Sequence, residues 1–316
     1  MRAADSVKAL MVGSDPAADL VDDPVRRRQD LARILAEPQD AAAPRARAGV
    51  RRRRFLVPLG GLAVAASAAL VLTLLLPTGP SGTAYAATPP PLSYRSASTD
   101  VPAPRLLADI AQRIDTLVEP DGPDAVLEWR DWSLFTRVDG RTVSSKVVAE
   151  DHRAVFHTDG SGTRTHGIDG GSPTTEPYQR GLYRDPVPAD PTLLRAALRE
   201  ATPAVDTASG LDQAVGGVLR TQALGPAQRA AVLELIADLP GLRYDGSVTD
   251  RAGRQGEAFS ADGDGSGLPT RYTFIVEATS GRVLGQEETL TTRAGSLNVP
   301  VPSVIGYTVY LSSGRQ

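Results

Sequence analysis

The chain has 316 residues, no cysteine and a formal net charge of −3. Without cysteine it can form no disulfide, no thiolate nucleophile and no cysteine-ligated metal site. The charge is unevenly divided, because residues 1–54 carry a balance of +4 and the remaining residues a balance of −7. We therefore expect a basic N-terminal arm followed by a larger, acidic part that must be stable through its own core.

Residues 1–54 are predicted to form a cytoplasmic arm that is mostly disordered. Asp23 and Pro24 make a good helix start, and a short helix can run from there to Glu37 before Pro38 ends it. This helix is either a partly formed segment of a disordered tail or a docking helix that orders against a cytosolic partner. The arm is too short to bury a core, so its activity in the cell must be binding. We expect its arginines to attract the anionic membrane surface and not nucleic acid.

The stretch from Phe55 to Leu76 contains no charged residue and nothing more polar than Ser67 and Thr73. As a helix rising about 1.5 Å per residue it would be roughly 33 Å long, enough to cross a hydrocarbon core of about 30 Å. A soluble core helix would have one polar face, and this segment has none. The sequence therefore predicts a single transmembrane helix over residues 55–76.

The direction of this span follows from the four arginines Arg51, Arg52, Arg53 and Arg54 at its N-terminal end. Positive charge stays on the cytoplasmic side, so we expect a cell-membrane protein with its N-terminus inside and the region after Leu76 exported. The alternative is a secretory signal cleaved after Ala86, because Ala84-Tyr85-Ala86 has the form of a cleavage site. The apolar run is longer than a signal core, which favours the anchor.

Residues 77–91 are rich in Pro, Gly, Ser, Thr and Ala and are predicted to be a linker, followed by an exported domain over residues 92–316. Apolar spacing and turn residues predict its elements. The expected helices are 103–119, a segment beginning at Asp190 and Pro191, one around 211–219, and 226–239. The expected strands are 92–98, 126–138, 141–149, 153–158, 163–168, 243–249, 256–261, 270–278, 282–291 and 304–311, with a long loop over 169–190. This order predicts an α+β fold, one antiparallel sheet covered by helices on one face.

Few residue patterns in the exported region indicate chemistry. The three histidines His152, His157 and His166 would have to converge to bind a metal, and we expect them on the surface of strands. The segment Asp262–Gly267 copies the opening of a calcium loop. Its twelfth position is Thr273 where the motif needs a glutamate, so we expect a glycine-rich hairpin loop.

No catalytic motif is found: the chain has no G-x-S-x-G, H-E-x-x-H, phosphate-binding loop or S-x-x-K. Glu287-Glu288 is interpreted as an acidic pair of a solvated strand. We therefore expect no enzyme, no cofactor and no metal. Trp129 and Trp132 lie three residues apart on one predicted strand, so they should point to opposite faces. One should be in the core, and the other is a candidate for lining a ligand cleft.

Three short motifs, together with the arginine-flanked span, carry a family resemblance. They are Ala86-Ala-Thr-Pro-Pro-Pro-Leu-Ser-Tyr94, Ala237-Asp-Leu-Pro-Gly-Leu242 and Glu277-Ala-Thr-Ser-Gly-Arg-Val-Leu284. With them the chain resembles an actinobacterial family of single-pass membrane proteins of unknown function, often encoded beside extracytoplasmic-function sigma factors. The resemblance implies a lipoprotein-carrier-like half barrel, a curved sheet closed by helices around an apolar concavity that is either a sensor pocket or filled.

The same resemblance supplies no catalytic residues, and the arm lacks the His/Cys zinc signature of one large class of anti-sigma factors. Two functions follow as hypotheses. The first is an extracytoplasmic sensor or binding domain in envelope signalling, which binds an apolar ligand or a partner while residues 1–54 contact a cytosolic regulator such as a sigma factor. The second is a membrane-tethered carrier that binds a lipid or a lipoprotein.

Overall fold

The fold comes from a computed structural model, which describes residues 86–95, 101–119, 122–139, 142–178, 183 and 185–316. The chain divides into two units, Met1–Leu76 and Pro77–Gln316, and all described residues belong to the second. The expected arm over 1–54 with Arg51–Arg54, the expected span over 55–76 and most of the expected linker lie outside the described residues. Within the described part of the chain, no helix has the length and apolar character needed to cross a membrane.

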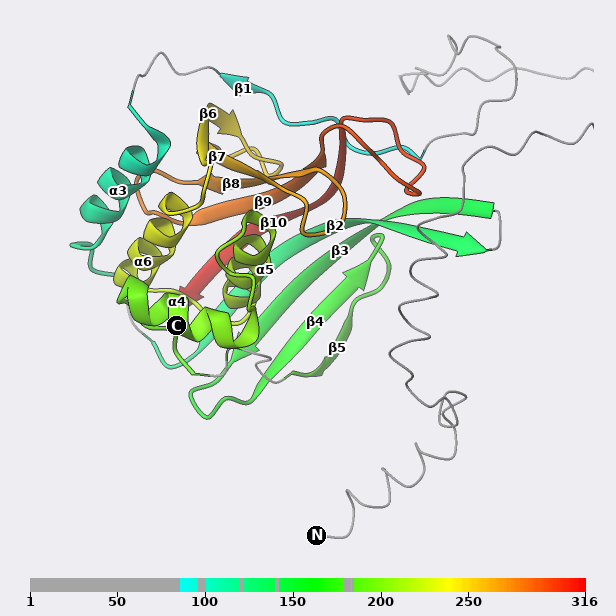
Figure 1. The fold of residues 1–316 in the computed structure, drawn as a ribbon. Coiled ribbons are helices and arrows are strands. Elements are labelled where there is room, and N and C mark those ends of the chain that lie inside the picture. Colours follow the sequence, from blue (N-terminus) through cyan, green and yellow to red (C-terminus); the bar gives the residue numbers. More distant parts are fainter. Residues whose placement is uncertain (1–85, 96–100, 120–121, 140–141, 179–182, 184) are drawn as a thin grey trace, which may run out of the picture. The chain divides into compact units, whose positions relative to one another are not determined.

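The domain is built on one ten-stranded antiparallel sheet with the order β1-β6-β7-β8-β9-β10-β2-β3-β4-β5 (Figure 1). Its first half along the chain contains β1 (Tyr94–Arg95), β2 (Ala125–Asp139), β3 (Thr142–Phe156), β4 (Gly162–Ile168) and β5 (Thr174–Pro177). The second half contains β6 (Arg243–Thr249), β7 (Gln255–Gly263), β8 (Thr270–Val276), β9 (Val283–Leu290) and β10 (Ser303–Arg315). The last strand, β10, pairs with both β9 and β2 and so joins the two halves into the single sheet that the sequence predicts.

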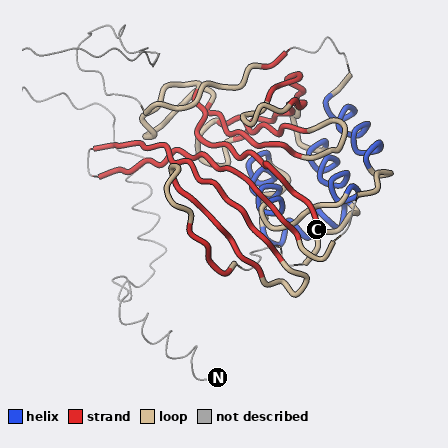
Figure 2. Tube along the Cα trace, turned by 180° about the vertical axis from the view of Figure 1, so that it is seen from behind, coloured by secondary structure: helices blue, strands red, loops and turns tan. Residues whose placement is uncertain are grey.

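Four helices lie on one face of this sheet, which we call the helix side; the opposite face is the outer side (Figures 1 and 2). They are α3 (Ala103–Ile114), α4 (Pro191–Ala201), α5 (Ala208–Leu219) and α6 (Pro226–Ala237). The starts of two helices follow from capping side chains. Asp190 accepts a hydrogen bond from the Leu193 amide, and Thr207 accepts one from the Gly210 amide. Proline at the first turn of α4 and α6 fixes the backbone angle that a helix start needs.

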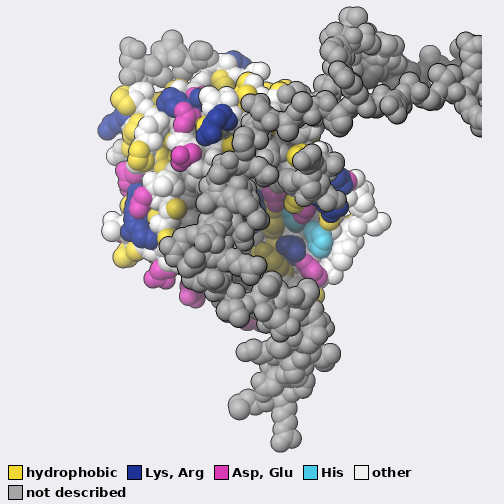
Figure 3. All heavy atoms as spheres, turned by 45° about the vertical axis from the view of Figure 1, so that its right-hand side comes forward, with side chains coloured by type: hydrophobic (Ala, Val, Ile, Leu, Met, Phe, Trp, Pro, Cys, Tyr) yellow, Lys and Arg dark blue, Asp and Glu magenta, His cyan; other side chains and the backbone are white. Residues whose placement is uncertain are grey.

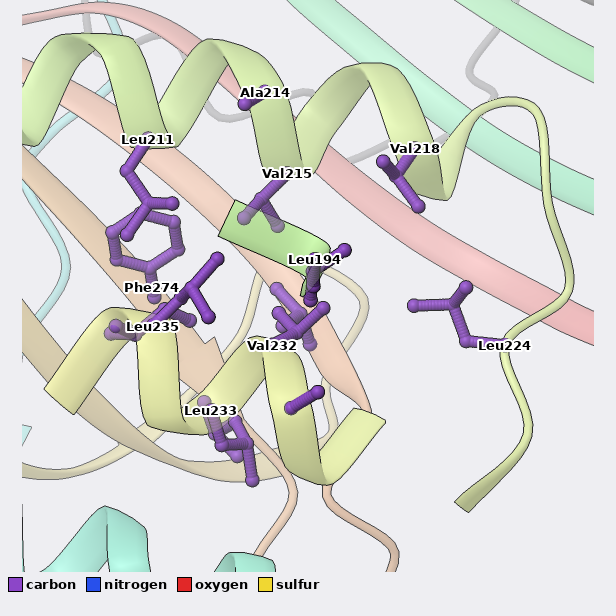
Figure 4. Close-up of a cluster of buried hydrophobic side chains, with 14 of the residues drawn as sticks. Leu194, Leu211, Ala214, Val215, Val218, Leu224, Val232, Leu233, Leu235 and Phe274 are labelled. Atoms are coloured by element: carbon purple, nitrogen blue, oxygen red, sulfur yellow. The ribbon is translucent and has the colours of Figure 1, made fainter. Parts of the chain in front are cut away.

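The hydrophobic core lies between these helices and the strands β7 to β10 and β2. Figure 4 shows Leu211, Val215 and Val218 of α5 pointing toward Val232 and Leu235 of α6, with Phe274 of β8 beneath them. All of these side chains are at most 3% exposed. Its large apolar side chains are almost fully buried, and a void at its edge, beside Leu224 and Val232, has a volume of about 60 Å³.

The outer side carries a second, smaller core made of Val248, Ala258, Ile275 and Leu284. Leu92 and Tyr94, from the segment just before and within β1, pack on it. Beside them, a buried ion pair joins Arg251 to Glu287, and Arg251 also donates to the carbonyl of Pro90. The described residues that follow the expected linker thus lie against the outer side of the sheet.

Three expected elements differ from the structure. The strands expected at 141–149 and 153–158 form one continuous strand, β3, because every residue from Thr142 to Phe156 pairs with β2. The loop expected at 169–190 contains β5, a polar edge strand without an apolar pattern. Helix α3 ends at Ile114 and not at residue 119, because Glu119 turns back to bind Arg229 of α6.

Leu233→Ala is expected to destabilise the domain by about 2–5 kcal/mol, because the fully buried leucine side chain would leave a cavity in the packed core. Urea unfolding, followed by fluorescence of the two tryptophans, measures this loss. The matched control is Leu193→Ala, which truncates a side chain that is 61% exposed and should cost less than about 0.5 kcal/mol. Equal losses in the two variants would contradict the core assignment.

Candidate functional site

A polar hollow of about 960 Å³ opens beside α5 on the helix side of the sheet, and we call it the α5 cleft. Its walls are α5, the turn between β7 and β8, and the helix-side residues of β9, β10 and β2. Among the described residues that line it, Arg220 is the one cationic side chain. The carboxylates are more numerous: Asp131, Glu150, Asp206, Asp212, Asp262, Asp264 and Glu288. Figure 3 shows histidine side chains next to acidic and basic ones in a hollow of the face that it draws.

Arg220 at the C-terminal end of α5 ties the helix to two strands of the sheet. Its Nη2 atom donates to Asp131 of β2 at 2.8 Å and to Thr308 of β10 at 2.6 Å. The Thr308 hydroxyl donates to the same carboxylate at 2.6 Å. Burial opposes ionisation of Asp131, but the Arg220 charge and these hydrogen bonds outweigh it and lower its pKa.

The α5 cleft also holds two carboxylates without such a partner, Asp212 of α5 and Glu288 of β9. Gln286 of β9 fixes Asp212, since its side-chain amide donates to the Asp212 carboxylate at 2.7 Å and to its carbonyl at 2.8 Å. Burial, reinforced by the Glu288 charge, raises the pKa of Asp212 to about 8. Burial likewise raises the pKa of Glu288, against the opposing effect of Arg220.

A row of aromatic rings continues the helix side from β2 to β4. Trp129 is 3% exposed and stacks on His152 of β3 with ring centroids 4.8 Å apart, and His152 lies 6.3 Å from His166 of β4. The Trp129 indole donates to Asp131 at 2.9 Å, and His152 Nε2 lies 3.5 Å from the same carboxylate. Trp129 therefore belongs to the core and also orients a carboxylate of the α5 cleft.

The expectation of surface histidines is wrong for His152, whose side chain is only 7% exposed. The cross-strand pairing of β3 with β4 brings it next to His166, a neighbour that spacing along one strand does not reveal. Burial lowers the pKa of His152. His157 follows β3, is about half exposed, and pairs with Asp124. Within the described residues, no three His, Asp or Glu side chains are arranged to hold a metal ion.

Trp132 lies three residues from Trp129, and its ring stacks on Tyr307 of β10 with centroids 5.7 Å apart. Tyr307 in turn lies under the guanidinium of Arg251, which pairs with Glu287 on the outer side. Trp132 is 8% exposed and contributes atoms to the lining of the α5 cleft. Both tryptophans are therefore buried beside charged groups.

The segment Asp262–Gly267 connects β7 to β8, as expected for a hairpin loop. Two arginines, Arg243 and Arg271, bind the Asp262 carboxylate. Thr273, at the twelfth position of the calcium pattern, is buried in β8. The loop thus forms one wall of the α5 cleft, with its first carboxylate already neutralised.

Sequence reasoning missed Asp131, Asp212, Arg220 and Glu288 as site residues. The interpretation of Glu287-Glu288 as a solvated pair is wrong, since Glu287 is 2% exposed and bound to Arg251, while Glu288 lies on the other face and lines the cleft. One signal was available for Asp212: it is the single charged residue of α5, a helix otherwise made of small, apolar and uncharged polar residues.

No protein-family model matches the chain, and no curated protein matches it. Four chains of solved structures are similar at a low level, among them the following three. The MucA/MucB complex of Pseudomonas aeruginosa gives 11% identity and a TM-score of 0.24 over 67% of this chain and 56% of that one. A DUF1329 family protein of Desulfovibrio piger ATCC 29098 has 8% sequence identity and a TM-score of 0.21, and the match covers 68% of this chain and 94% of that one. The third structure is a putative outer membrane lipoprotein-sorting protein domain from Vibrio parahaemolyticus. It has 10% sequence identity and a TM-score of 0.19, and the match covers 66% of this chain and 92% of that one.

The chain thus spans little more than half the length of the first of these structures. TM-scores of about 0.2 do not establish a shared fold, and identities near 10% carry no residue from one site to another. The charged cleft beside α5 is therefore interpreted from its own residues.

Asp131→Asn is expected to lower the free energy of unfolding at pH 7 by about 1.5–3 kcal/mol, because it removes hydrogen bonds made to a charged group. The folded protein lowers the pKa of Asp131, so this stabilisation is complete above the ordinary value near 3.8 and is lost as the pH falls through the lower folded value. Urea unfolding between pH 7 and pH 2.5 should therefore show the variant and the parent converging in acid. A difference that stays constant over this range would contradict the role of the charge.

Proposed function

We propose that this chain is a single-pass membrane-anchored binding protein whose exported domain takes a small polar ligand in the α5 cleft. We further propose that residues 1–54 contact a cytosolic regulator, so that the protein acts in envelope signalling. The observation that carries the proposal is the cleft itself, a charged hollow of about 960 Å³ in a domain whose apolar core is closely packed.

The size and the stiffness of the cleft support a binding role. Pockets for small molecules measure about 300–1,000 Å³ and are usually formed before the ligand arrives. Arg220 joins α5 to β2 and β10, and Gln286 joins it to β9, so three strands hold the helix that forms one wall. A site held in this way loses little conformational entropy when it binds.

We propose binding and not catalysis. The sequence has none of the motifs that place a nucleophile beside a base. The ionised carboxylate of Asp131 accepts hydrogen bonds from Arg220 and Thr308, so its role is structural. The remaining carboxylates of the cleft can recognise charge or hydrogen-bond donors without covalent chemistry.

The signalling half of the proposal is supported by the sequence of the arm. The helix start at Asp23 and Pro24 precedes Leu31, Ile34 and Leu35, which share one face of a helix at spacings of three and four. An amphipathic helix of this kind fits a groove of a cytosolic partner, and a sigma factor is the partner that the family resemblance implies.

The alternative function, a membrane-tethered carrier of a lipid or a lipoprotein, would use an apolar cavity. The void beside the packed core measures about 60 Å³, whereas burying an acyl chain requires several times this volume. A carrier role would therefore require the helices to separate from the sheet. Mass spectrometry of the purified chain tests it, since a carrier should retain stoichiometric lipid.

A panel of small polar compounds should include ligands that raise the melting temperature of the full-length chain in detergent. A ligand at one hundred times its Kd adds about 2.7 kcal/mol of stability, which is roughly 5–10 °C for a domain of this size. Gln213→Trp places a bulky ring in the cleft from an exposed position of α5 and should abolish the shift.

The matched control for this experiment is Glu200→Trp, which adds the same ring to an exposed position of α4 outside the cleft. It should leave the ligand-induced shift unchanged. A shift that survives Gln213→Trp would place the ligand elsewhere, and retained lipid without any polar ligand would favour the carrier.

The arm is tested separately by affinity capture from a cytosolic extract with the full-length chain in detergent. The chain should retain a regulator that a variant with Leu31, Ile34 and Leu35 changed to Asp does not retain. The matched control changes Arg26, Arg27 and Arg28 to Gln, which leaves the apolar face of the expected helix intact. Equal capture by the parent and the Asp variant would remove the signalling role.

A further inference from the structure

Three of the seven acidic side chains that line the α5 cleft have arginine partners among the described residues. Asp206 is bound by Arg195 and Arg199, at 2.7 and 2.6 Å. Asp262 is bound by Arg243 and Arg271, at 3.0 and 3.1 Å. Asp131 is bound by Arg220 at 2.8 Å. These carboxylates are therefore compensated before any ligand enters.

Asp212 and Glu288 differ from them. Asp212 is about nine-tenths buried, and its Oδ1 atom accepts from the neutral amide of Gln286. Its Oδ2 atom has no hydrogen-bond partner among the described residues, and no cation of the described part of the chain forms an ion pair with Asp212 or Glu288. Both carboxylates line the cleft. The cleft thus contains two neighbouring acidic groups that form no ion pair within the described part of the chain, although the charge of Arg220 attracts both.

A buried carboxylate without a partner is costly, and a protein relieves this cost either by protonating the group or by supplying a cation. The Nη2 atom of the nearby Arg220 is held by Asp131 and Thr308 on neighbouring strands, so Arg220 attracts Asp212 and Glu288 through space without an ion pair to either among the described residues. Burial outweighs this attraction and raises the pKa of both carboxyl groups, which favours their protonation in the free protein. A ligand that brings a positive charge would replace the proton.

The space around the pair fits an organic cation better than a bare metal ion. No three metal-ligating side chains converge within the described residues, whereas the hollow, with a volume of about 960 Å³, has room for a small organic molecule. The ring of Tyr272 on β8, which is 3% exposed, forms an aromatic wall close to the carboxylates. Aromatic rings and carbon chains pack together, and an ammonium group is attracted to the face of a ring.

We propose that the ligand of the α5 cleft is an organic cation whose ammonium group binds between Asp212 and Glu288. This inference rests on the proposed function, and it names the chemical class that the cleft selects. Binding forms hydrogen bonds from the ammonium group to the two carboxylates and expels the proton that they hold in the empty cleft.

The number of protons released on binding can be measured and tests the proposal. The charged and titratable groups that face the pair are Arg220 at the end of α5, Asp131 on β2, Tyr272 on β8 and Tyr310 on β10. The two tyrosines have raised pKa values, Arg220 stays charged, and the pKa of Asp131 is lowered, so none of these four changes charge between pH 6 and 9. Proton release in this range therefore comes from Asp212 and Glu288.

Isothermal titration calorimetry of the full-length chain in detergent with spermidine tests the proposal, at 150 mM salt and in buffers of different ionisation enthalpy. We expect saturable binding, release of protons at pH 7, and an affinity that rises at least threefold between pH 6 and 7.5, a range in which the amines of spermidine stay protonated. Asp212→Asn and Glu288→Gln keep the size of the side chains and should each weaken binding at least tenfold.

Glu200→Gln is the matched control, because it removes the same charge from an exposed position of α4 outside the cleft. It should leave the affinity unchanged, which separates a site from general attraction to an acidic surface. Absent binding of spermidine, binding without proton release, or equal binding by Asp212→Asn and its parent would each overturn the proposal. Glucose and citrate are titrated in parallel: if either binds in a manner that Gln213→Trp abolishes, the cation inference fails while the proposed binding function stands.

Discussion

The bond from Arg220 to Asp131 and Thr308 is the interaction on which the rest of the site depends. It connects the end of α5 to strands β2 and β10, which come from opposite halves of the chain. With that end fixed, the helix holds Asp212 above Gln286 of β9. The same bond directs the Nη2 atom of Arg220 to Asp131, while Asp212 and Glu288 form no ion pair among the described residues. One arginine thus positions the helix that forms a wall of the cleft.

The domain separates an apolar interior from a polar one. Helices α5 and α6 pack on Phe274 and its neighbours (Figure 4), while charged groups line the α5 cleft and follow β2, β3 and β4. A core packed in this way gives the domain stability without disulfides, which the chain cannot form. The packed core therefore supplies the stability of the domain, and the residues that line the α5 cleft are available for binding.

The elements of this fold could largely be predicted from the sequence. Strand β6 and the starts of α4 and α6 lie where alternation, capping residues and proline place them. The candidate site could not be predicted in the same way, because its members come from α5, β2, β9 and β10 and meet only through strand pairing. Glu287 and Glu288 together have the pattern of a solvated strand. In the structure both faces of β9 are covered, so Glu287 pairs with Arg251 on the outer side and Glu288 lines the α5 cleft on the helix side. The spacing of Trp129 and Trp132 predicts opposite faces, with one ring in the core and the other at a cleft. The contacts of these rings with Asp131 and Tyr307 are tertiary features that the spacing does not reveal.

The central claim is that Asp212 holds a proton in the empty cleft and gives it up to a bound cation. Carbon-13 NMR of the side-chain carboxyl group of Asp212, titrated with pH in the presence and absence of spermidine, tests it most directly. The account predicts a transition well above the ordinary value of 3.8 in the free protein and a clear downward displacement of that transition when the amine is bound. An Asp212 carboxyl that titrates near its ordinary value of 3.8, or one whose titration spermidine leaves unchanged, would contradict it.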